Sequence, residues 1–303
     1  MIRIRDLLLI GIVVFIWGLN FVVIKIGLEQ FPPLLFSALR FLTAALPWAF
    51  ILGRGNLKWS VILSVGFALG FAQFSFLFVG IYLGMPPGLS SLVLQSQVIF
   101  TVILGIFVFA DLPNRFQWAG ILIGVLGVAV IGETVAADAE IPAISFVFLL
   151  LAGLSWAVSN ILMKRAGQID MLRLILWMSL VPPLPLLILS SVFETGQIDS
   201  ILAFDLKAAA TLIYVGLIST IFAFAIWGQM LKRYSPLTVA PFSLLVPIFG
   251  MSLSALLLDE SFGPVRMAGS ALVMAGLALI VLSPRLKQAW AARLPGRVGG
   301  RPK

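Results

Sequence analysis

The chain has 303 residues, of which 61% are hydrophobic and only 11% are charged, and its formal net charge is +8. Soluble domains carry about a quarter charged residues, so this chain cannot cover a water-facing surface and is expected to lie in a lipid bilayer. It has no cysteine and no histidine, which excludes disulfides, the usual zinc ligands and catalytic groups built on either residue.

Along the chain, charged residues, glycines and prolines separate ten apolar runs. Each run approaches the roughly 20 residues that a helix needs to cross a bilayer core about 30 Å thick. Barrel strands are half as long and alternate in polarity, which these runs do not. We therefore predict an all-α polytopic membrane protein with ten transmembrane helices at 7–28, 32–52, 59–83, 87–110, 116–134, 142–163, 171–193, 206–231, 237–258 and 264–282.

The basic residues fall into alternating loops. With the N-terminus in the cytoplasm, the outer loops hold only Lys25, Lys207 and Arg266, and Arg40 lies inside the second run. The inner segments hold Arg3, Arg5, Arg54, Lys58, Arg115, Lys164, Arg165, Arg173, Lys232, Arg233, Arg285, Lys287, Arg293, Arg297, Arg301 and Lys303. Cytoplasmic loops of membrane proteins carry this excess, so we expect a multi-pass inner-membrane protein with both termini in the cytoplasm.

Six of the inner basic residues follow the last run, in segment 285–303. A basic cluster directly after a membrane helix is typical of a tail held at the cytoplasmic membrane surface. The net positive charge therefore indicates a lipid bilayer, and not nucleic acid, as the partner.

The two halves of the chain resemble each other. Residues 87–131 align without gaps on 236–280 at a constant offset of 149, which pairs Pro87 with Pro236 and Asp111 with Glu260. We predict one repeat at 1–135, a second at 136–284 and the tail at 285–303. Five helices per half is an odd number, so the second repeat is expected to be inverted in the membrane. Inverted repeats are typical of secondary transporters, whose binding site lies near the midplane.

Three sequence stretches carry a resemblance to a known family. They are Trp17-Gly18-Leu19-Asn20-Phe21 with Lys25 and Arg40-Phe41, Met85 to Gln95, and Ala240 to Pro247. They resemble the EamA family of the drug/metabolite transporter superfamily, especially its bacterial amino-acid exporters for O-acetylserine and cysteine and for aromatic amino acids. The resemblance spans nearly the whole chain. It implies ten helices around a central cavity and export of amino acids and related metabolites from the cytoplasm.

Polar and aromatic side chains within the runs are the candidate substrate-binding residues, because a polar group at membrane depth needs a partner or cavity water. The first and sixth helices offer similar groups, a tryptophan followed by an asparagine on one helix face. The candidates are Trp17, Asn20, Gln73, Tyr82, Gln95, Trp156, Asn160 and Tyr214. Interhelical packing, with each amide bonded to a neighbouring backbone, remains the alternative for Asn20 and Asn160.

On the fourth helix, Gln95 and Gln97 lie about 200° apart if the helix is regular. Only one of them can then face the cavity directly, and Gln95 is preferred. Trp227 on the eighth helix adds aromatic surface, although aromatic residues near helix ends are more often interface anchors. Arg40 either binds a substrate carboxylate or holds a structural partner, and Lys25 and Lys164 are expected to reach the headgroups.

Glycines and prolines predict how the helices pack and bend. Gly120 and Gly124 form a Gly-x-x-x-Gly pair on the fifth helix, with Ala271 and Ala275 as the expected counterpart on the tenth. These two helices are predicted to clamp the halves together, away from the cargo. Proline-dependent bends are expected on the seventh and ninth helices, at Pro182, Pro183, Pro185, Pro241 and Pro247.

The leading hypothesis is a secondary transporter that exports small neutral or zwitterionic metabolites. A broad drug exporter is an alternative, although exporters of cationic drugs often use a buried carboxylate and every acid here falls at or beyond a helix end. A non-transporting scaffold subunit is another. An enzyme is not expected without a nucleophile or metal cluster, and no cofactor, no metal ion and no catalytic residue is predicted. A monomer is plausible, but the sequence does not fix the oligomeric state.

Overall fold

The computed structural model describes residues 2–46 and 48–292, and in these ranges the chain is helical, without strands. Ten helical stretches are long and apolar enough to cross a membrane. They are Ile4–Gly27, Pro33–Leu52, Trp59–Tyr82, Pro87–Phe109, Arg115–Ala136, Ala143–Ala166, Met171–Phe193, Leu206–Arg233, Ala240–Leu257 and Pro264–Gln288. These spans, numbered one to ten below, confirm the predicted fold class.

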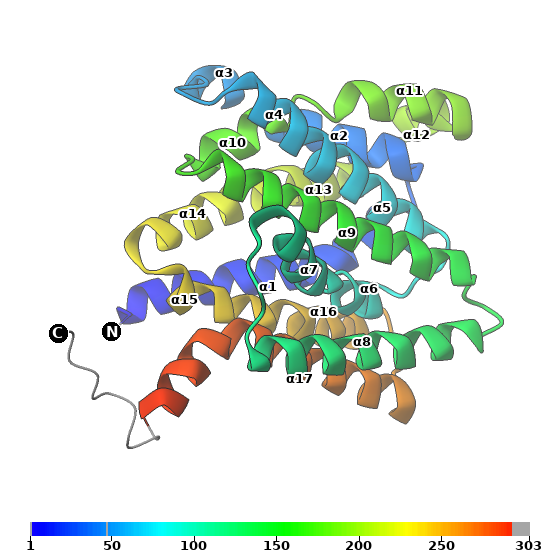
Figure 1. Cartoon of the computed structure of the whole chain (residues 1–303). Coiled ribbons are helices and arrows are strands. Elements are labelled where there is room, and N and C mark those ends of the chain that lie inside the picture. The colour runs from blue at the N-terminus through cyan, green and yellow to red at the C-terminus, as the bar shows by residue number, and fades with distance from the viewer. Residues whose placement is uncertain (1, 47, 293–303) are drawn as a thin grey trace.

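Several spans consist of more than one helical element (Figure 1). The first half comprises α1 (Ile4–Gly27), α2 (Pro33–Ala45), α3 (Trp48–Leu52), α4 (Trp59–Val65), η1 (Gly66–Gln73), α5 (Phe74–Tyr82), α6 (Pro87–Val93), α7 (Ser96–Phe109) and α8 (Arg115–Ala136). The second comprises α9 (Ala143–Ala166), α10 (Met171–Met178), α11 (Pro183–Phe193), α12 (Gln197–Leu202), α13 (Leu206–Ile213), η2 (Tyr214–Phe222), α14 (Ala223–Arg233), α15 (Pro236–Val239), η3 (Ala240–Leu244), α16 (Leu245–Leu257) and α17 (Pro264–Ala292). Of these, η1 and η2 are π-helical and η3 is a 3₁₀ helix.

Proline sets where many of these helices begin. It occupies the first helical position of α2, α6, α11 and α17, at Pro33, Pro87, Pro183 and Pro264. Its missing N–H costs nothing there, because the first N–H groups of a helix have no partner within the helix. As predicted, prolines accompany breaks in two spans: span seven between α10 and α11, and span nine at η3, which holds Pro241. At Pro247 no break occurs, because α16 continues through this residue.

The structure differs from the sequence expectation in two places. A short helix, α12, follows span seven in a segment for which no helix was expected. In addition, α17 continues past the predicted end at 282 to Ala292, with Pro284 inside the helix. The first part of the expected basic tail, from Arg285, is therefore helical, whereas Arg293, Arg297, Arg301 and Lys303 lie outside the described residues.

Large apolar side chains cover the outside of the bundle. Phe107 is 81% exposed, Leu122 69% and Leu206 85%. A water-soluble protein rarely exposes so many large apolar side chains together. The buried polar residues lie between the helices instead, and they include Ser37, Gln73 and Ser90. This inside-out arrangement is the one expected of a protein with lipid as its solvent.

Helices α8 and α17 form the tightest long contact in the bundle and lie side by side at one edge (Figure 1). A Cβ atom on Gly120 would lie 2.6 Å from the carbonyl oxygen of Gly276, and one on Gly127 would lie 2.6 Å from the backbone nitrogen of Val273. Glycine is needed here because the two backbones touch.

The predicted pairing of helices five and ten is thus confirmed, but the predicted residues on α17 were wrong. Ala271 and Ala275 are exposed, whereas Gly269, Val273 and Gly276 meet α8. The spacing of small residues on α17 allows either face to pack, and only the mate helix decides which one is buried.

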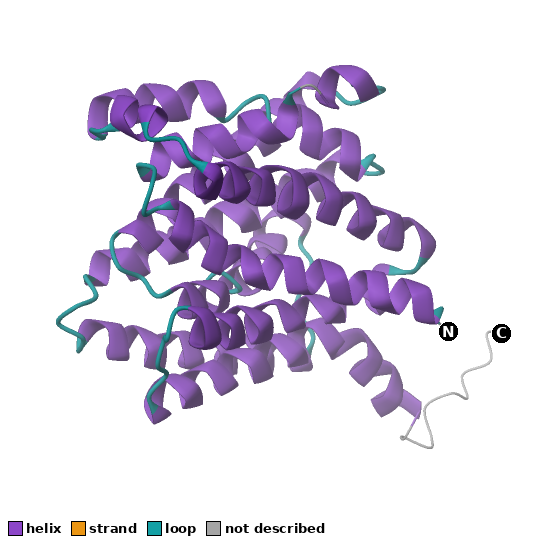
Figure 2. Ribbon diagram, turned by 180° about the vertical axis from the view of Figure 1, so that it is seen from behind, coloured by secondary structure: helices purple, strands orange, loops and turns teal. Residues whose placement is uncertain are grey.

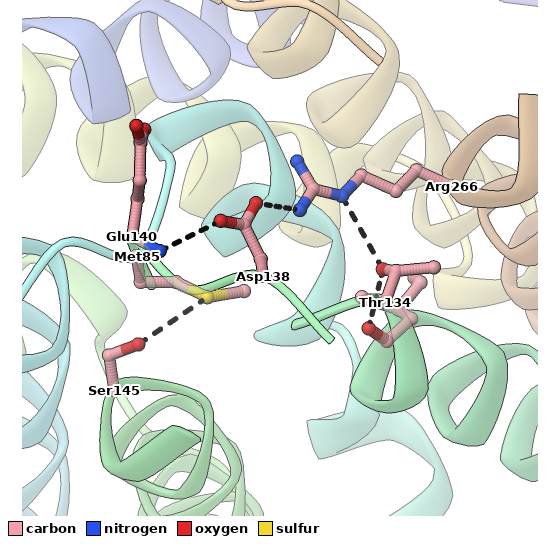
Figure 3. A network of polar contacts seen from close by, with 7 residues as sticks. Met85, Thr134, Asp138, Glu140, Ser145 and Arg266 are labelled. Carbon is pink, nitrogen blue, oxygen red and sulfur yellow. Dashed lines mark hydrogen bonds and ion pairs between the residues drawn. The ribbon is translucent and has the colours of Figure 1, made fainter. Parts of the chain in front are cut away.

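Acidic residues outside the spans hold loops and helix ends. Figure 3 shows Asp138, in the loop after α8, accepting hydrogen bonds from the backbone N–H of Glu140 and from Arg266 on α17, at 3.0 and 2.6 Å. These contacts lower the pKa of Asp138, the Glu140 hydrogen bond most and the Arg266 guanidinium next. Arg266 also donates to Thr134, so the network ties α17 to the end of α8.

The start of α1 and the last turns of α17 lie at the same end of the bundle, in Figure 1 and again from behind in Figure 2. An even number of crossings produces this arrangement, in agreement with ten spans.

Candidate functional site

A cavity of about 400 Å³ lies between the helices, and residues from eight of the ten spans line it. The described residues of spans five and ten contribute none. The lining residues are Trp17, Asn20, Phe21, Arg40, Phe41, Leu69, Gln73, Phe74, Leu77, Ser91, Leu94, Gln95, Gln97, Trp156, Asn160, Met163, Met171, Ile175, Met178, Ser219, Thr220, Phe224, Trp227, Leu231, Ala240, Ser243 and Val246. This volume suits a molecule the size of an amino acid or a small drug fragment.

Irregular helix segments surround the cavity. Spans three and eight each contain a π-helical stretch, and η1 ends at Gln73 while η2 carries Ser219 and Thr220. Spans four and nine are interrupted at Leu94–Gln95 and at η3. π-Helical stretches are frequent at functional sites, and non-helical backbone at membrane depth is tolerated where it lines a cavity or is buried in protein.

One wall of the cavity is aromatic. Trp17 packs against Phe224 and Trp227, with ring centroids 5.0 and 5.1 Å apart. The indole N–H of Trp17 donates to the carbonyl oxygen of Ser219 at 3.1 Å, which satisfies a backbone group of η2. Trp17 therefore offers its ring to the cavity while it fastens span one to span eight.

The amides of the site fall into two groups. Asn20, Gln73 and Gln95 are 7%, 1% and 7% exposed, and the side-chain oxygens of Asn20 and Gln73 have no hydrogen-bond partner. Asn160, in contrast, donates to Gln97 Oε1 at 2.8 Å and to a threonine hydroxyl, that of Thr101, at 3.1 Å. Buried amide oxygens without a partner are costly, so those of Asn20 and Gln73 are suited to receive a ligand donor.

The expectation that only one glutamine of span four faces the cavity was wrong. Both Gln95 and Gln97 line it. The 200° separation assumes a regular helix, but α6 ends at Val93 and α7 begins at Ser96. Because the helix is interrupted between these residues, the separation expected of a regular helix does not apply to Gln95 and Gln97.

Six of the predicted residues line this cavity: Trp17, Asn20, Gln73, Gln95, Trp156 and Asn160. Tyr82 does not. It is 56% exposed and lines a separate hollow near the start of α2. Tyr214 is absent from the lining as well, and its hydroxyl donates to the carbonyl oxygen of Ile16 at 2.9 Å. Both tyrosines belong to spans that line the cavity, but Tyr82 lines the other hollow and the hydroxyl of Tyr214 binds span one.

Arg40 was left open between a structural and a binding role. It lies in the middle of α2, is 2% exposed and lines the cavity. One guanidinium nitrogen donates to Thr220 Oγ1 at 3.1 Å, and the guanidinium carbon lies 4.1 Å from the ring centroid of Phe74. Nε and the other terminal nitrogen have no partner. Its place in an apolar run was the sequence signal for this residue.

The lining contains Arg40 as its one charged residue and no acidic one among the described positions. Among residues 2–46 and 48–292, no cluster of three or more acidic residues is arranged to hold a metal ion. The cavity is therefore apolar and aromatic, with neutral amides and one guanidinium as its polar groups.

Comparisons with known proteins also indicate a membrane transporter. The model of the EamA-like transporter family matches residues 5–132 and again 143–282. A protein of Salmonella typhimurium named a probable amino-acid metabolite efflux pump is 40% identical over 96% of this chain and 99% of its own length. Its Escherichia coli K12 namesake is 38% identical over 94% and 97%. A transporter of Bacillus subtilis is 26% identical over 88% and 92%. One solved crystal structure superposes with a TM-score of 0.62 at 18% identity, covering 94% of this chain and 99% of that one.

Proposed function

Because the chain belongs to the EamA-like transporter family, we propose that it exports amino acids or related small zwitterionic metabolites from the cytoplasm. Two relatives covered almost end to end are named probable amino-acid metabolite efflux pumps. The observation that carries the proposal is the composition of the cavity. It combines an aromatic wall with unpartnered amide oxygens and one guanidinium, which together match a side chain, an ammonium and a carboxylate.

Inverted repeats at 1–135 and 136–284 are part of this proposal. The offset of 149 found in the sequence moves η1 at Gly66–Gln73 onto 215–222, where η2 spans Tyr214–Phe222. The same offset moves the break at Leu94–Gln95 onto 243–244, at the end of η3. Irregularities that recur at one offset support two copies of one unit, and alternation between such copies is the usual transport device.

The direction of export rests on orientation. The cavity extends toward the end of the bundle that holds Met171, where span seven begins, and Leu231, in the last turn of span eight. With the predicted orientation, both termini and this end face the cytoplasm. The opposite end is held by acidic caps: Glu260 accepts from the N–H of Gly88 at 2.9 Å, and Glu194 from that of Leu34 at 2.6 Å. In this arrangement the cavity is ready to load from inside.

The same cavity argues against the other readings. A cationic drug would meet the buried positive charge of Arg40 with no carboxylate among the described lining residues. A scaffold subunit has no use for a cavity with unpartnered polar groups, which cost stability. A catalytic role lacks a nucleophile–base pair, since the chain has no histidine and no cysteine.

Export from cells tests the proposal. Cells that overproduce the protein are fed dipeptides, so that intracellular peptidases raise the level of each amino acid in turn. We expect faster appearance of at least one neutral amino acid in the medium than in cells with an empty vector. Unchanged release for the whole panel, together with resistance to cationic drugs, would favour the drug exporter instead.

A further inference from the structure

In the part of the chain that the structure describes, Arg40 is buried without a counter-ion, which is an unfavourable place for an arginine that serves only the structure. It is 2% exposed in the middle of α2, and the ion pairs among the described residues do not include it. An arginine stays charged in proteins, and a buried charge without a counter-ion costs several kcal/mol. Other arginines of the chain show the paired alternative, such as Arg266 with Asp138 at 2.6 Å.

The neighbours of Arg40 orient it without neutralising it. Thr220 accepts from one terminal nitrogen at 3.1 Å, and the hydroxyl hydrogen of Thr220 goes to the carbonyl oxygen of Val215 at 2.7 Å. The guanidinium carbon lies over the ring of Phe74, 4.1 Å from its centroid, a contact that suits a weakly hydrated cation. Nε and the second terminal nitrogen remain free to donate.

We propose that Arg40 is the carboxylate anchor of the cargo site, and that the transported substrates are carboxylates whose amino group is met by Asn20 and Gln73. This assignment rests on the proposed function and names the chemistry that its site selects. A guanidinium with unused nitrogens can bind a carboxylate through two parallel hydrogen bonds. The unpartnered oxygens of Asn20 and Gln73 line the same cavity and can accept from an ammonium.

The anchor makes a prediction about selectivity. Because the described lining holds one positive and no negative side chain, the guanidinium of Arg40 gains an anionic partner only when the cargo brings a carboxylate. Amino acids should therefore be preferred over their carboxamides or methyl esters, which have the same side chain and ammonium but no anionic group. Loss of a charge-assisted hydrogen bond lowers affinity by about tenfold to hundredfold.

The test compares transport of a labelled amino acid with that of its carboxamide in proteoliposomes. Wild type should favour the acid by about tenfold or more. Arg40→Gln should lose that preference, and Arg40→Lys should keep part of it, because lysine retains the charge but not the planar fork. Arg266→Gln is the matched control, since it removes an ion-paired arginine outside the cavity and should leave the preference unchanged.

Thermal unfolding in detergent separates an anchor from a structural role. Removing a buried charge that has no counter-ion should leave the ligand-free midpoint of Arg40→Gln equal to that of wild type or higher, whereas Arg266→Gln should unfold at a lower temperature. Carboxylates such as benzoate should stabilise wild type and not Arg40→Gln. Should Arg40→Gln fail to accumulate, Arg40→Met carries both measurements, because it also removes the charge and keeps a side chain of similar length.

The outcomes distinguish this inference from the proposed function. If wild type moves amino acids and a folded Arg40 variant keeps the full acid preference, the anchor is wrong and the exporter stands. If wild type moves no amino acid but benzoate stabilises it through Arg40, the anchor stands and amino-acid export is wrong. An Arg40→Gln midpoint as low as that of Arg266→Gln, with the acid preference intact, would assign Arg40 to structure.

Discussion

Asn20 and Asn160 occupy similar places in the two halves, each one turn after a tryptophan, yet their amides differ in what they contact. Asn160 donates to Gln97 and Thr101, so it links span six to span four. Asn20 is 7% exposed, and its side-chain oxygen has no partner. At the scale of single residues, this contrast indicates that Asn20 is available to bind a ligand, whereas Asn160 holds two helices together.

We therefore expect Asn20→Ala to lower substrate affinity by about tenfold to hundredfold without lowering the thermal unfolding midpoint. Asn160→Ala should lower the midpoint as well, because it leaves Gln97 and Thr101 without a donor, at a cost of about 1–3 kcal/mol. Transport assays and thermal unfolding of the purified variants measure both effects. An Asn20→Ala protein that folds and transports at the wild-type rate would remove Asn20 from the site.

The candidate residues of the site could be chosen from the sequence because polar groups within apolar runs are rare. Six of the eight line one cavity, but Tyr82 and Tyr214 do not. Spans three and eight, which carry these tyrosines, leave the regular helix in η1 and η2, and no local sequence pattern marks a π-helical stretch. The pairing of Gln95 with Gln97 at the cavity was missed for the same kind of reason.

At the scale of helices, the contact between α8 and α17 is the most demanding. A Cβ atom on Gly127 would lie 2.6 Å from the nitrogen of Val273 and 2.8 Å from the oxygen of Gly269, and both atoms belong to the backbone. A methyl group can only be accommodated if the helices separate.

Gly127→Ala should accordingly destabilise the protein by about 1–3 kcal/mol, the usual cost of overpacking. Gly105→Ala is the control, because a Cβ atom there would meet nothing within 4 Å and alanine favours the helix. Thermal unfolding in detergent should show a lower midpoint for Gly127→Ala alone. Equal midpoints for the two variants would contradict the close helix contact.

The cap on α6 adds a pH dependence. Glu260 accepts from the N–H groups of Gly88 and Leu89, at 2.9 and 3.4 Å, and burial raises its pKa despite these hydrogen bonds. An acid whose pKa is raised on folding contributes most to stability below its unfolded pKa, about 4.3, and that contribution is lost as pH rises through the folded value.

Relative to Glu260→Gln, which does not titrate, the wild type should therefore lose stability as pH rises from about 4 toward neutrality. Unfolding midpoints of both proteins across this range provide the measurement. A difference that stays constant, or grows in favour of the wild type, would show that Glu260 is not desolvated in this way.

The number and order of the transmembrane helices were predictable, because an apolar run of about 20 residues in a membrane protein almost always forms a spanning helix. Proline marked the breaks in spans seven and nine for a clear reason, since it cannot donate within a helix. The face of α17 that meets α8 was not predictable, because glycine and alanine occur on both sides of that helix. The extra helix α12 and the extension of α17 lie outside the apolar runs, where hydropathy carries no signal.

At the scale of the whole molecule, the absence of cysteine allows accessibility to be measured with single substitutions. Met171 lines the cavity near its proposed cytoplasmic end, whereas Tyr82 is exposed at the other end of the bundle. Met171→Cys should react with an impermeant thiol reagent in everted vesicles and not in intact cells, and Tyr82→Cys should do the reverse. Labelling of Met171→Cys from outside the cell would overturn the proposed orientation.

The central claim, amino-acid export through this cavity, is tested most directly by flux in proteoliposomes that contain the purified protein. A panel of labelled amino acids should include at least one that exchanges faster than in protein-free liposomes. With no carboxylate among the described lining residues, that exchange should proceed without an imposed pH gradient. Exchange no faster than in protein-free liposomes for every amino acid tested, with or without the gradient, would contradict the account.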